Sequence, residues 1–139
     1  MIAASEYISS SENETKLIAS DISQKLKPGN IVALIGQLGT GKTFLVKSIC
    51  ENWEIHDVTS PTFSIVNQYS GKINVNHFDF YRIKNSEELC NIGFEEYLMN
   101  GKAVTFIEWA DMFPEILPKD IIIIKITYLA NNKRKITID

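Results

Sequence analysis

The stretch GQLGTGKT, from Gly36 to Thr43, has the residue types and the spacing needed to hold the phosphates of a nucleotide. It matches the pattern G-x-x-x-x-G-K-S/T, and it lies between an apolar run and a stretch with helical periodicity. Glycines let the backbone turn sharply and direct N–H groups at phosphate oxygens. The lysine would supply a positive charge to the β- and γ-phosphates, and the final threonine hydroxyl would be a Mg²⁺ ligand. The predicted phosphate-binding residues are Gly36, Gly39, Thr40, Gly41, Lys42 and Thr43.

Two acidic residues at the ends of predicted strands could complete such a site. Asp79 lies in HFDFYR and Glu108 lies in FIEW. Ligands of open α/β sheets gather beyond the C-terminal ends of the strands, so a carboxylate there is well placed to hold a metal ion. The alternative for each is a surface acid at a strand end, and the neighbouring loop favours the functional interpretation. For His77, packing or hydrogen bonding within a strand is a simpler explanation than catalysis.

The nucleotide and the reaction are constrained by residues that the chain lacks. No N-K-x-D motif for guanine is present, which favours ATP. The only arginines are Arg82 and Arg134, so an arginine that stabilises the transferring phosphoryl group within the chain must be one of these. This scarcity predicts slow hydrolysis that a partner would accelerate. The segment SPTF, Ser60–Phe63, could sense the γ-phosphate through Thr62, and the alternative for it is a rigid structural loop.

Hydrophobic periodicity indicates the elements that must position these residues. A short strand at 5–8 precedes a helix that begins near Ser9–Ser11 and places Leu17, Ile18, Ile22 and Leu26 at helical spacing. Ile31–Ile35 is expected to be a buried strand. The following helix, 42–53, would bury a side that carries Phe44, Leu45, Ile49 and Trp53.

The remainder of the chain alternates between strands and short helices. We expect two strands around Ser70-Gly71, one or two helices within 85–102, a buried strand at 103–109, a proline-rich loop at 113–118 and a terminal hairpin around 130–132. This order predicts an α/β fold, a P-loop NTPase-like three-layer sandwich with a mixed parallel and antiparallel central sheet. The length of 139 residues predicts one domain, 1–139.

The composition is that of an ordinary soluble protein. The net charge is −3, and no basic stripe suggests direct wrapping of nucleic acid. Cys50 and Cys90 have no paired spacing and lie in helical segments, so we expect both to be reduced and buried. The N-terminal segment lacks the features of a signal peptide, and the longest apolar run, Ile121–Ile124, is too short to cross a bilayer. We therefore predict a cytoplasmic protein with no membrane partner.

Taken together, these segments resemble the TsaE (formerly YjeE) family of small P-loop ATPases. That family serves bacterial synthesis of N6-threonylcarbamoyladenosine at position 37 of tRNA. The resemblance extends from about Tyr7 to Arg134. It rests on GQLGTGKT, SPTFSIVNQY, HFDFYRI, the Glu-Glu-Leu to Glu-Tyr-Leu series at 87–98, and IEW followed by Leu117-Pro118.

The resemblance implies a role for particular residues. ATP and Mg²⁺ would bind the loop with Thr43 and Glu108 as metal ligands, and Asp79 would be needed for hydrolysis together with Lys42 and Thr62. Trp109 would lie beside the metal site and report nucleotide binding. The residues that match family positions near the adenine end of ATP are Glu12 and Arg134.

The resemblance also implies partners. The family binds a complex of TsaB and TsaD, and its ATPase cycle supports repeated turnover, so tRNA would be contacted only indirectly. Two departures from the family pattern are Gln37, where Asp is usual, and Phe44, where a second Thr is common. The second removes a hydroxyl that would reach the α-phosphate. Two other classes of protein remain as alternatives to an accessory ATPase. One is a small-molecule kinase of the nucleotide type, and the other is a nucleotide-dependent binding module without hydrolysis.

Overall fold

The computed structural model describes residues 2–37, 39–61 and 64–139 of the chain. Its strands are β1 (Ser5–Ser9), β2 (Ile31–Ile35), β3 (Val66–Tyr69), β4 (Asn74–Asp79), β5 (Ala103–Glu108), β6 (Ile122–Tyr128) and β7 (Arg134–Ile138). Its helices are α1 (Glu12–Lys25), α2 (Lys42–Glu51), α3 (Glu87–Asn91) and α4 (Phe94–Met99), with short 3₁₀ helices η1 (Ala110–Met112) and η2 (Pro114–Ile116).

The described strands form one seven-stranded sheet in the order β1-β7-β6-β2-β5-β4-β3. The four inner strands β6, β2, β5 and β4 are parallel to their neighbours within this set. The three outer strands pair antiparallel, β7 with β6, β1 with β7, and β3 with β4. The predicted mixed sheet is therefore confirmed, and β2, which ends at the glycine-rich loop, lies among the parallel strands.

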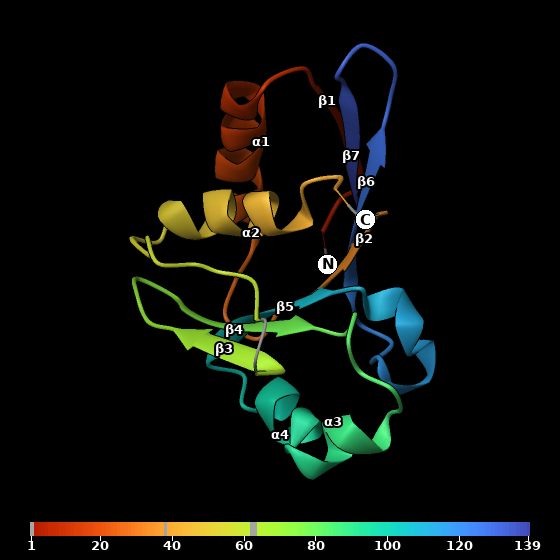
Figure 1. Cartoon of the computed structure of the whole chain (residues 1–139). Coiled ribbons are helices and arrows are strands. Elements are labelled where there is room, and N and C mark those ends of the chain that lie inside the picture. Colours follow the sequence, from red (N-terminus) through yellow and green to blue (C-terminus); the bar gives the residue numbers. More distant parts are fainter. Residues whose placement is uncertain (1, 38, 62–63) are drawn as a thin grey trace.

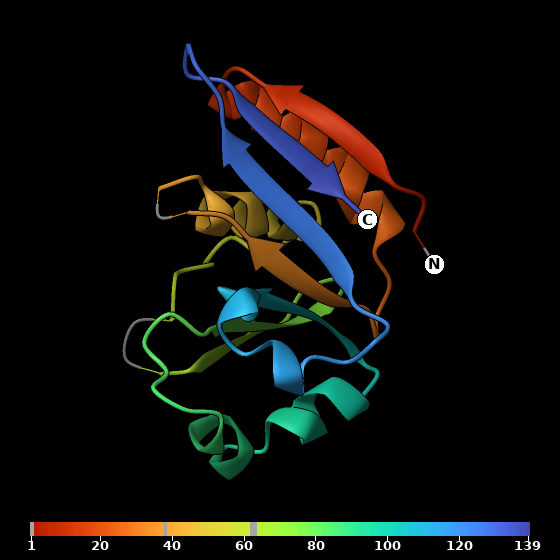
Figure 2. The same ribbon diagram turned by 90° about the vertical axis from the view of Figure 1, so that its right-hand side faces the viewer.

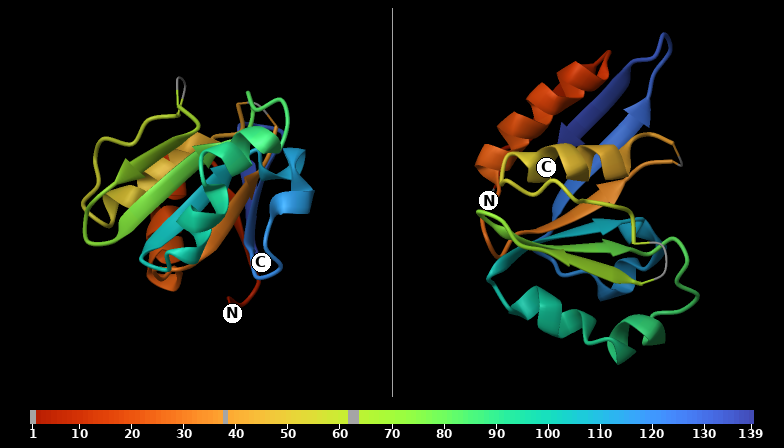
Figure 3. Two further views of the ribbon diagram at one scale, coloured as in Figure 1. Left: turned by 90° about the horizontal axis from the view of Figure 1, so that it is seen from below. Right: turned by 60° about the vertical axis from the view of Figure 1, so that its left-hand side comes forward.

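Helices cover both faces of the strongly twisted sheet (Figures 1 and 2). Helices α1 and α2 lie over one face, while α3, α4 and the 3₁₀ helices lie on the other (Figure 3). Successive side chains of β2 point to opposite faces of the sheet. Val32 and Leu34 belong to the hydrophobic cluster under α1 and α2, whereas Ala33 belongs to the cluster on the other face. A strand buried on both faces needs a continuous apolar sequence, and IVALI supplies it. The fold is the predicted three-layer α/β sandwich.

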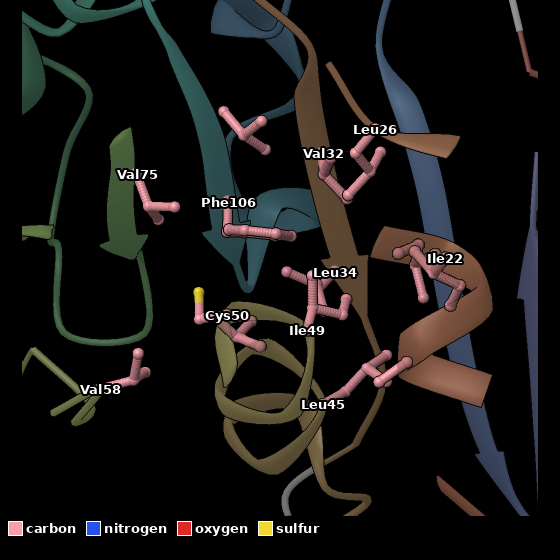
Figure 4. Close-up of a cluster of buried hydrophobic side chains, with 14 of the residues drawn as sticks. Ile22, Leu26, Val32, Leu34, Leu45, Ile49, Cys50, Val58, Val75 and Phe106 are labelled. Carbon is pink, nitrogen blue, oxygen red and sulfur yellow. The ribbon is translucent and has the colours of Figure 1, made fainter. Parts of the chain in front are cut away.

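The core under α1 and α2 fixes the start of α2 against the sheet. Leu45, Ile49 and Cys50 point from α2 toward β2 and β5, where they meet Leu34 and Phe106 (Figure 4). All five side chains are completely buried. Because removing apolar surface from water is the main stabilising term in folding, this contact holds the N-terminus of α2 at the edge where β2 ends.

Helix α1 begins where its sequence predicts, and it ends at Lys25. Ser11 is the N-cap, and its hydroxyl accepts a hydrogen bond from the Glu14 backbone N–H at 3.1 Å. Glu14 returns the interaction by accepting from the Ser10 backbone N–H. Acidic residues in the first turn and Lys25 in the last turn complement the helix dipole. This cap fixes Glu12 at the first turn, close to the C-terminal strands.

Two burial predictions, for Cys90 and Phe44, are wrong, and one apolar residue at helical spacing in α1 is exposed. Leu17 is 72% exposed because the side of α1 that faces the sheet runs through Ile18 and Ile22, and Leu17 lies beyond its border. Cys90 is exposed because α3 is a single short turn whose inward residue is Leu89. Phe44 is only half-buried. In addition, the predicted loop at 113–118 contains η2, a turn that Pro114 begins.

Two substitutions in α1 test how the helix is anchored. Ile22→Ala is expected to lower the free energy of unfolding by about 2–5 kcal/mol, because it opens a cavity in a fully buried site. The matched control Leu17→Ala, on the same helix, should change it by less than about 0.5 kcal/mol. Chemical denaturation of both variants measures the difference. Equal losses for the two variants would contradict the described face of α1.

Candidate active site

The loop between β2 and α2 turns through two glycines with positive φ. Gly39 has φ +81° and Gly41 has φ +100°, values that L side chains rarely adopt. Gly36 is needed for a different reason, since a Cβ there would meet the Ile126 carbonyl oxygen at 2.8 Å. The Thr40 hydroxyl donates to the Gln37 carbonyl oxygen at 2.8 Å and braces the turn. The loop is therefore held in shape by its own residues and by β6.

Lys42 is the first residue of α2, and its side chain folds back over the loop. Its Nζ donates to the carbonyl oxygens of Gly36 at 2.6 Å and Gln37 at 3.1 Å. The ammonium group also lies 4.1 Å from the centroid of the Trp109 ring, a cation–π contact. Burial lowers the pKa of Lys42, although the nearby carboxylates of Glu108 and Asp79 oppose this change. The cation is thus held over the loop by uncharged partners, two carbonyl oxygens and an aromatic ring.

The two predicted acids are brought together by strand pairing. Asp79 ends β4 and Glu108 ends β5, and the two residues are direct partners in the parallel ladder. Leu34 near the end of β2 pairs with Glu108 on its other side. All three strands therefore present their C-terminal ends at one edge of the sheet, next to the glycine-rich loop. This is the arrangement predicted from the sequence.

Glu108 is almost completely buried and is held by hydrogen bonds from two other elements. The Thr43 hydroxyl on α2 lies 2.9 Å from Oε1 and 3.0 Å from Oε2 of Glu108. His77 Nε2, on β4, lies 2.5 Å from Oε2. The predicted metal ligands Thr43 and Glu108 are thus in direct contact. The interpretation of His77 as a hydrogen-bonded strand histidine is confirmed, but the sequence did not indicate that its partner is Glu108.

Asp79 lies beside Glu108 at the same edge of the sheet and is less buried than Glu108. Its Oδ1 accepts from the Tyr81 backbone N–H at 2.9 Å, and its Oδ2 accepts from the Ser60 hydroxyl at 3.4 Å. Burial raises the pKa of Asp79, and the negative charge of Glu108 adds to that effect, while the bond from Tyr81 opposes it. A carboxylate whose pKa is raised is better able to accept a proton, as a general base must.

A cavity of about 560 Å³ opens in front of these residues. Its lining includes Lys42, Thr43, Asp79, Glu108 and Trp109, and a volume of this size suits a small ligand. Several further lining residues were given no role from the sequence, among them Tyr81, Ile65 and Glu88, although all three lie within segments that carry the family resemblance. Tyr81 reaches Trp109, with ring centroids 4.8 Å apart.

A second cavity, of about 200 Å³, lies on the other side of the N-terminus of α2. Glu12 from α1 and Arg134 from β7, both predicted near the adenine end of a nucleotide, line it together with Thr40. Gly41 and Phe44 line both cavities, so the two lie next to each other at the start of α2. Phe44, predicted to be buried, instead forms part of the wall between them.

The two arginines are divided between the cavities. Arg82 lines the larger one, and Arg134 lines the smaller. The Nε atom of Arg134 is buried and has no hydrogen-bond partner among the described residues. A buried donor without a partner is costly, so this atom fits a site that a ligand acceptor completes. Thr62, the remaining predicted site residue, lies outside the described residues.

The donor atoms at the edge of the sheet fit a magnesium ion that is also bound by phosphate. Thr43 and Glu108 supply hard oxygen ligands, and Mg²⁺ commonly uses one or two such protein ligands with water and phosphate oxygens. In the described part of the chain, no group of three or more His, Cys, Asp and Glu could hold a metal ion by itself. None of the helices described here is long and apolar enough to span a bilayer.

Comparison with known proteins gives a consistent result. Residues 9–136 match the family model described as threonylcarbamoyl adenosine biosynthesis protein TsaE. The tRNA threonylcarbamoyladenosine biosynthesis protein TsaE of Rickettsia prowazekii is 41% identical over 127 residues, which cover 89% of this chain and 87% of that protein. The protein of the same name from Bacillus subtilis is 37% identical over 126 residues, covering 89% of this chain and 78% of that protein.

A solved structure extends the similarity to the fold. The crystal structure of YdiB from Bacillus subtilis superposes with a TM-score of 0.80 at 31% sequence identity. The alignment covers 99% of this chain and 86% of the YdiB chain. The arrangement of strands and helices is therefore shared along almost the whole chain.

Asp79→Asn is expected to raise the melting temperature at neutral pH. Burial raises the pKa of Asp79 in the folded protein above its value in the unfolded chain. The neutral carboxyl group therefore costs nothing at low pH, and the free energy of unfolding falls as the pH rises through the folded-state pKa and the group ionises. Asn stays neutral and can still accept the bond from Tyr81, so the difference in melting temperature should grow from about pH 3 to about pH 8.

Thermal unfolding across this range measures the effect, with Asp120→Asn as a control because Asp120 is exposed and lines neither of these two cavities. The control should show no comparable trend. The prediction is wrong if Asp79→Asn melts at the same temperature as the unmodified protein, or at a lower one, at neutral pH. In that case the ionised carboxylate does not lower the free energy of unfolding.

Proposed function

Because this chain belongs to the TsaE family, we propose that it is a Mg²⁺-dependent ATPase of the cytoplasm that supports tRNA threonylcarbamoyladenosine synthesis together with TsaB and TsaD. The observation that carries this proposal is the contact between Thr43, on the helix that follows the glycine-rich loop, and both carboxylate oxygens of Glu108. This pair joins a phosphate-binding loop to an acidic strand end, which is the combination that nucleotide hydrolysis requires.

The phosphates would be held by the loop and by Lys42. The start of α2 offers unpaired backbone N–H groups and the positive end of a helix dipole to an anion. Lys42 Nζ is held by two carbonyl oxygens and an aromatic ring, and a phosphate oxygen would be a stronger partner for it than these. We therefore expect Lys42 to exchange its carbonyl contacts for phosphate when ATP binds.

The two acids would have separate tasks. Glu108 and Thr43 would hold Mg²⁺, whose chemistry when bound is to neutralise charge that develops on the phosphate oxygens. Asp79 has a raised pKa and lines the same cavity, so it would orient a water molecule and accept its proton. Arg82 lines this cavity as well and would be the arginine nearest the phosphates.

The smaller cavity would receive the adenine end of ATP. Its walls are formed by Glu12, Phe44 and Arg134, and the buried Nε of Arg134 would donate to an acceptor of the ligand. Phe44 offers an apolar ring where a hydroxyl is common in relatives, so the contact with the α-phosphate would come from backbone groups alone. We expect the affinity for ATP to be lower than in relatives that have the second threonine.

The proposal is tested by mixing the purified protein with TsaB, TsaD and ATP, and measuring complex formation and phosphate release. The unmodified protein should bind the two partners and hydrolyse ATP faster in their presence. Lys42→Ala should lose at least about tenfold in ATP affinity, because a charge-assisted hydrogen bond to phosphate is removed. Lys47→Ala, an exposed lysine on the same helix, is the matched control and should behave like the unmodified protein.

Failure of the unmodified protein to form the complex and to show stimulated hydrolysis would contradict the proposal. Transfer of the γ-phosphate to a nucleoside or nucleotide instead of water would identify a kinase. Equal ATP affinities of Lys42→Ala and Lys47→Ala would show that the loop is not the phosphate site.

A further inference from the structure

His77 is a completely buried polar residue that lies behind the site. It belongs to β4, and its side chain is on the same face of the sheet as those of Val75 and Asp79, toward α2. Its Nε2 lies 2.5 Å from Glu108 Oε2. Since an ionised carboxylate can only accept hydrogen bonds, Nε2 must carry the hydrogen in this pair. The contact therefore fixes the tautomer of the ring as well as its orientation.

This contact makes the two oxygens of Glu108 unequal. Oε2 accepts from His77 and shares the single hydrogen of the Thr43 hydroxyl with Oε1, whereas Oε1 contacts no donor except that hydroxyl among the described residues. Oε1 thus keeps more unused acceptor capacity than Oε2. A carboxylate held at one oxygen cannot rotate freely, so the direction in which the other oxygen points is set in advance.

The opposite side of the imidazole ring is also held. His77 Nδ1 lies 3.5 Å from the Tyr69 hydroxyl. In this tautomer Nδ1 accepts, and the single hydrogen of the Tyr69 hydroxyl is shared between Nδ1 and the Thr59 carbonyl oxygen, which lies 2.8 Å from it. The same hydroxyl accepts from the Thr59 backbone N–H at 3.1 Å. The ring therefore lies between Glu108 and the backbone of Thr59. The next residue, Ser60, contacts Asp79 through its hydroxyl.

We propose that His77 is a positioning residue that orients the Glu108 carboxylate for a divalent cation, with Tyr69 holding the ring from behind. The inference rests on the proposed function, because it assigns a role at the same metal site. Groups that hydrogen-bond a metal ligand from behind orient it and alter metal affinity, typically about 10–100-fold. His77 would act in this way through Nε2 alone, without touching nucleotide or metal.

Three substitutions distinguish the orientation of Glu108 from a purely structural role of His77. In His77→Gln the side-chain amide can occupy the place of Nε2 and donate to Glu108. In His77→Asn the shorter amide matches Nδ1 and faces Tyr69, while His77→Leu has no donor. Calorimetric titration with ATP, once with excess Mg²⁺ and once with EDTA, measures how much Mg²⁺ strengthens binding in each variant.

The proposal predicts that the gain in ATP affinity from Mg²⁺ falls at least about tenfold in His77→Asn and His77→Leu. His77→Gln should keep that gain within about threefold, and affinity in EDTA should change by less than about twofold in all three. Thermal unfolding establishes that each variant is folded. If His77→Leu does not fold, the two amide variants decide the matter, because they differ mainly in where the N–H lies.

A Mg²⁺ gain in His77→Asn equal to that in the unmodified protein would overturn the proposal. Equal losses of affinity with and without Mg²⁺ would also overturn it, because they would mean that His77 only supports the fold. An unmodified protein that binds ATP without any response to Mg²⁺ would instead overturn the proposed function, and this inference with it.

Discussion

The buried carboxylate of Glu108 is the interaction on which the rest of the site depends. Removing a carboxylate from water is costly unless hydrogen bonds replace those of the solvent. Here the donors come from Thr43 on α2 and His77 on β4, while Glu108 itself ends β5. Three separate elements must therefore be correctly placed before this charge can be buried. A fold that satisfies the carboxylate also brings the glycine-rich loop beside it.

Strand register is what satisfies this requirement. In the parallel pair of β4 and β5, Asp79 lies opposite Glu108, and both point toward α2 because side chains alternate along a strand. A slip of one residue would turn one strand's polar side chains to the other face. That face is filled by aromatic rings, among them Phe78 and Phe94, whose centroids are 5.0 Å apart. The aromatic cluster under α3 and α4 thus fixes the register that the polar site needs.

Much of this arrangement could be predicted from the sequence because it depends on local signals. The pattern GQLGTGKT between an apolar run and an amphipathic helix is specific, and acids at the ends of buried strands indicate the catalytic edge of an α/β sheet. The strand Ile31–Ile35 was predicted with its observed bounds. These features need no knowledge of which strands are neighbours.

What could not be predicted depends on pairings between distant segments. The contact of His77 with Glu108 requires the register of two strands that are separated by two helices. The smaller cavity brings Glu12 and Arg134, near opposite ends of the chain, together with Thr40, and only the family resemblance indicated that Glu12 and Arg134 lie near each other. Phe44 fitted the helical period of a buried side, yet it forms a wall between the cavities because one cavity lies on either side of the helix start.

The most direct test of this account is a crystal structure of the protein with Mn²⁺ and a non-hydrolysable ATP analogue, in which anomalous scattering locates the metal. We expect a single strong peak at the loop, coordinated by Thr43 Oγ1 and a carboxylate oxygen of Glu108, with the base in the cavity lined by Glu12 and Arg134. A metal bound elsewhere, or an analogue that leaves the loop and Lys42 as they are described here, would contradict it.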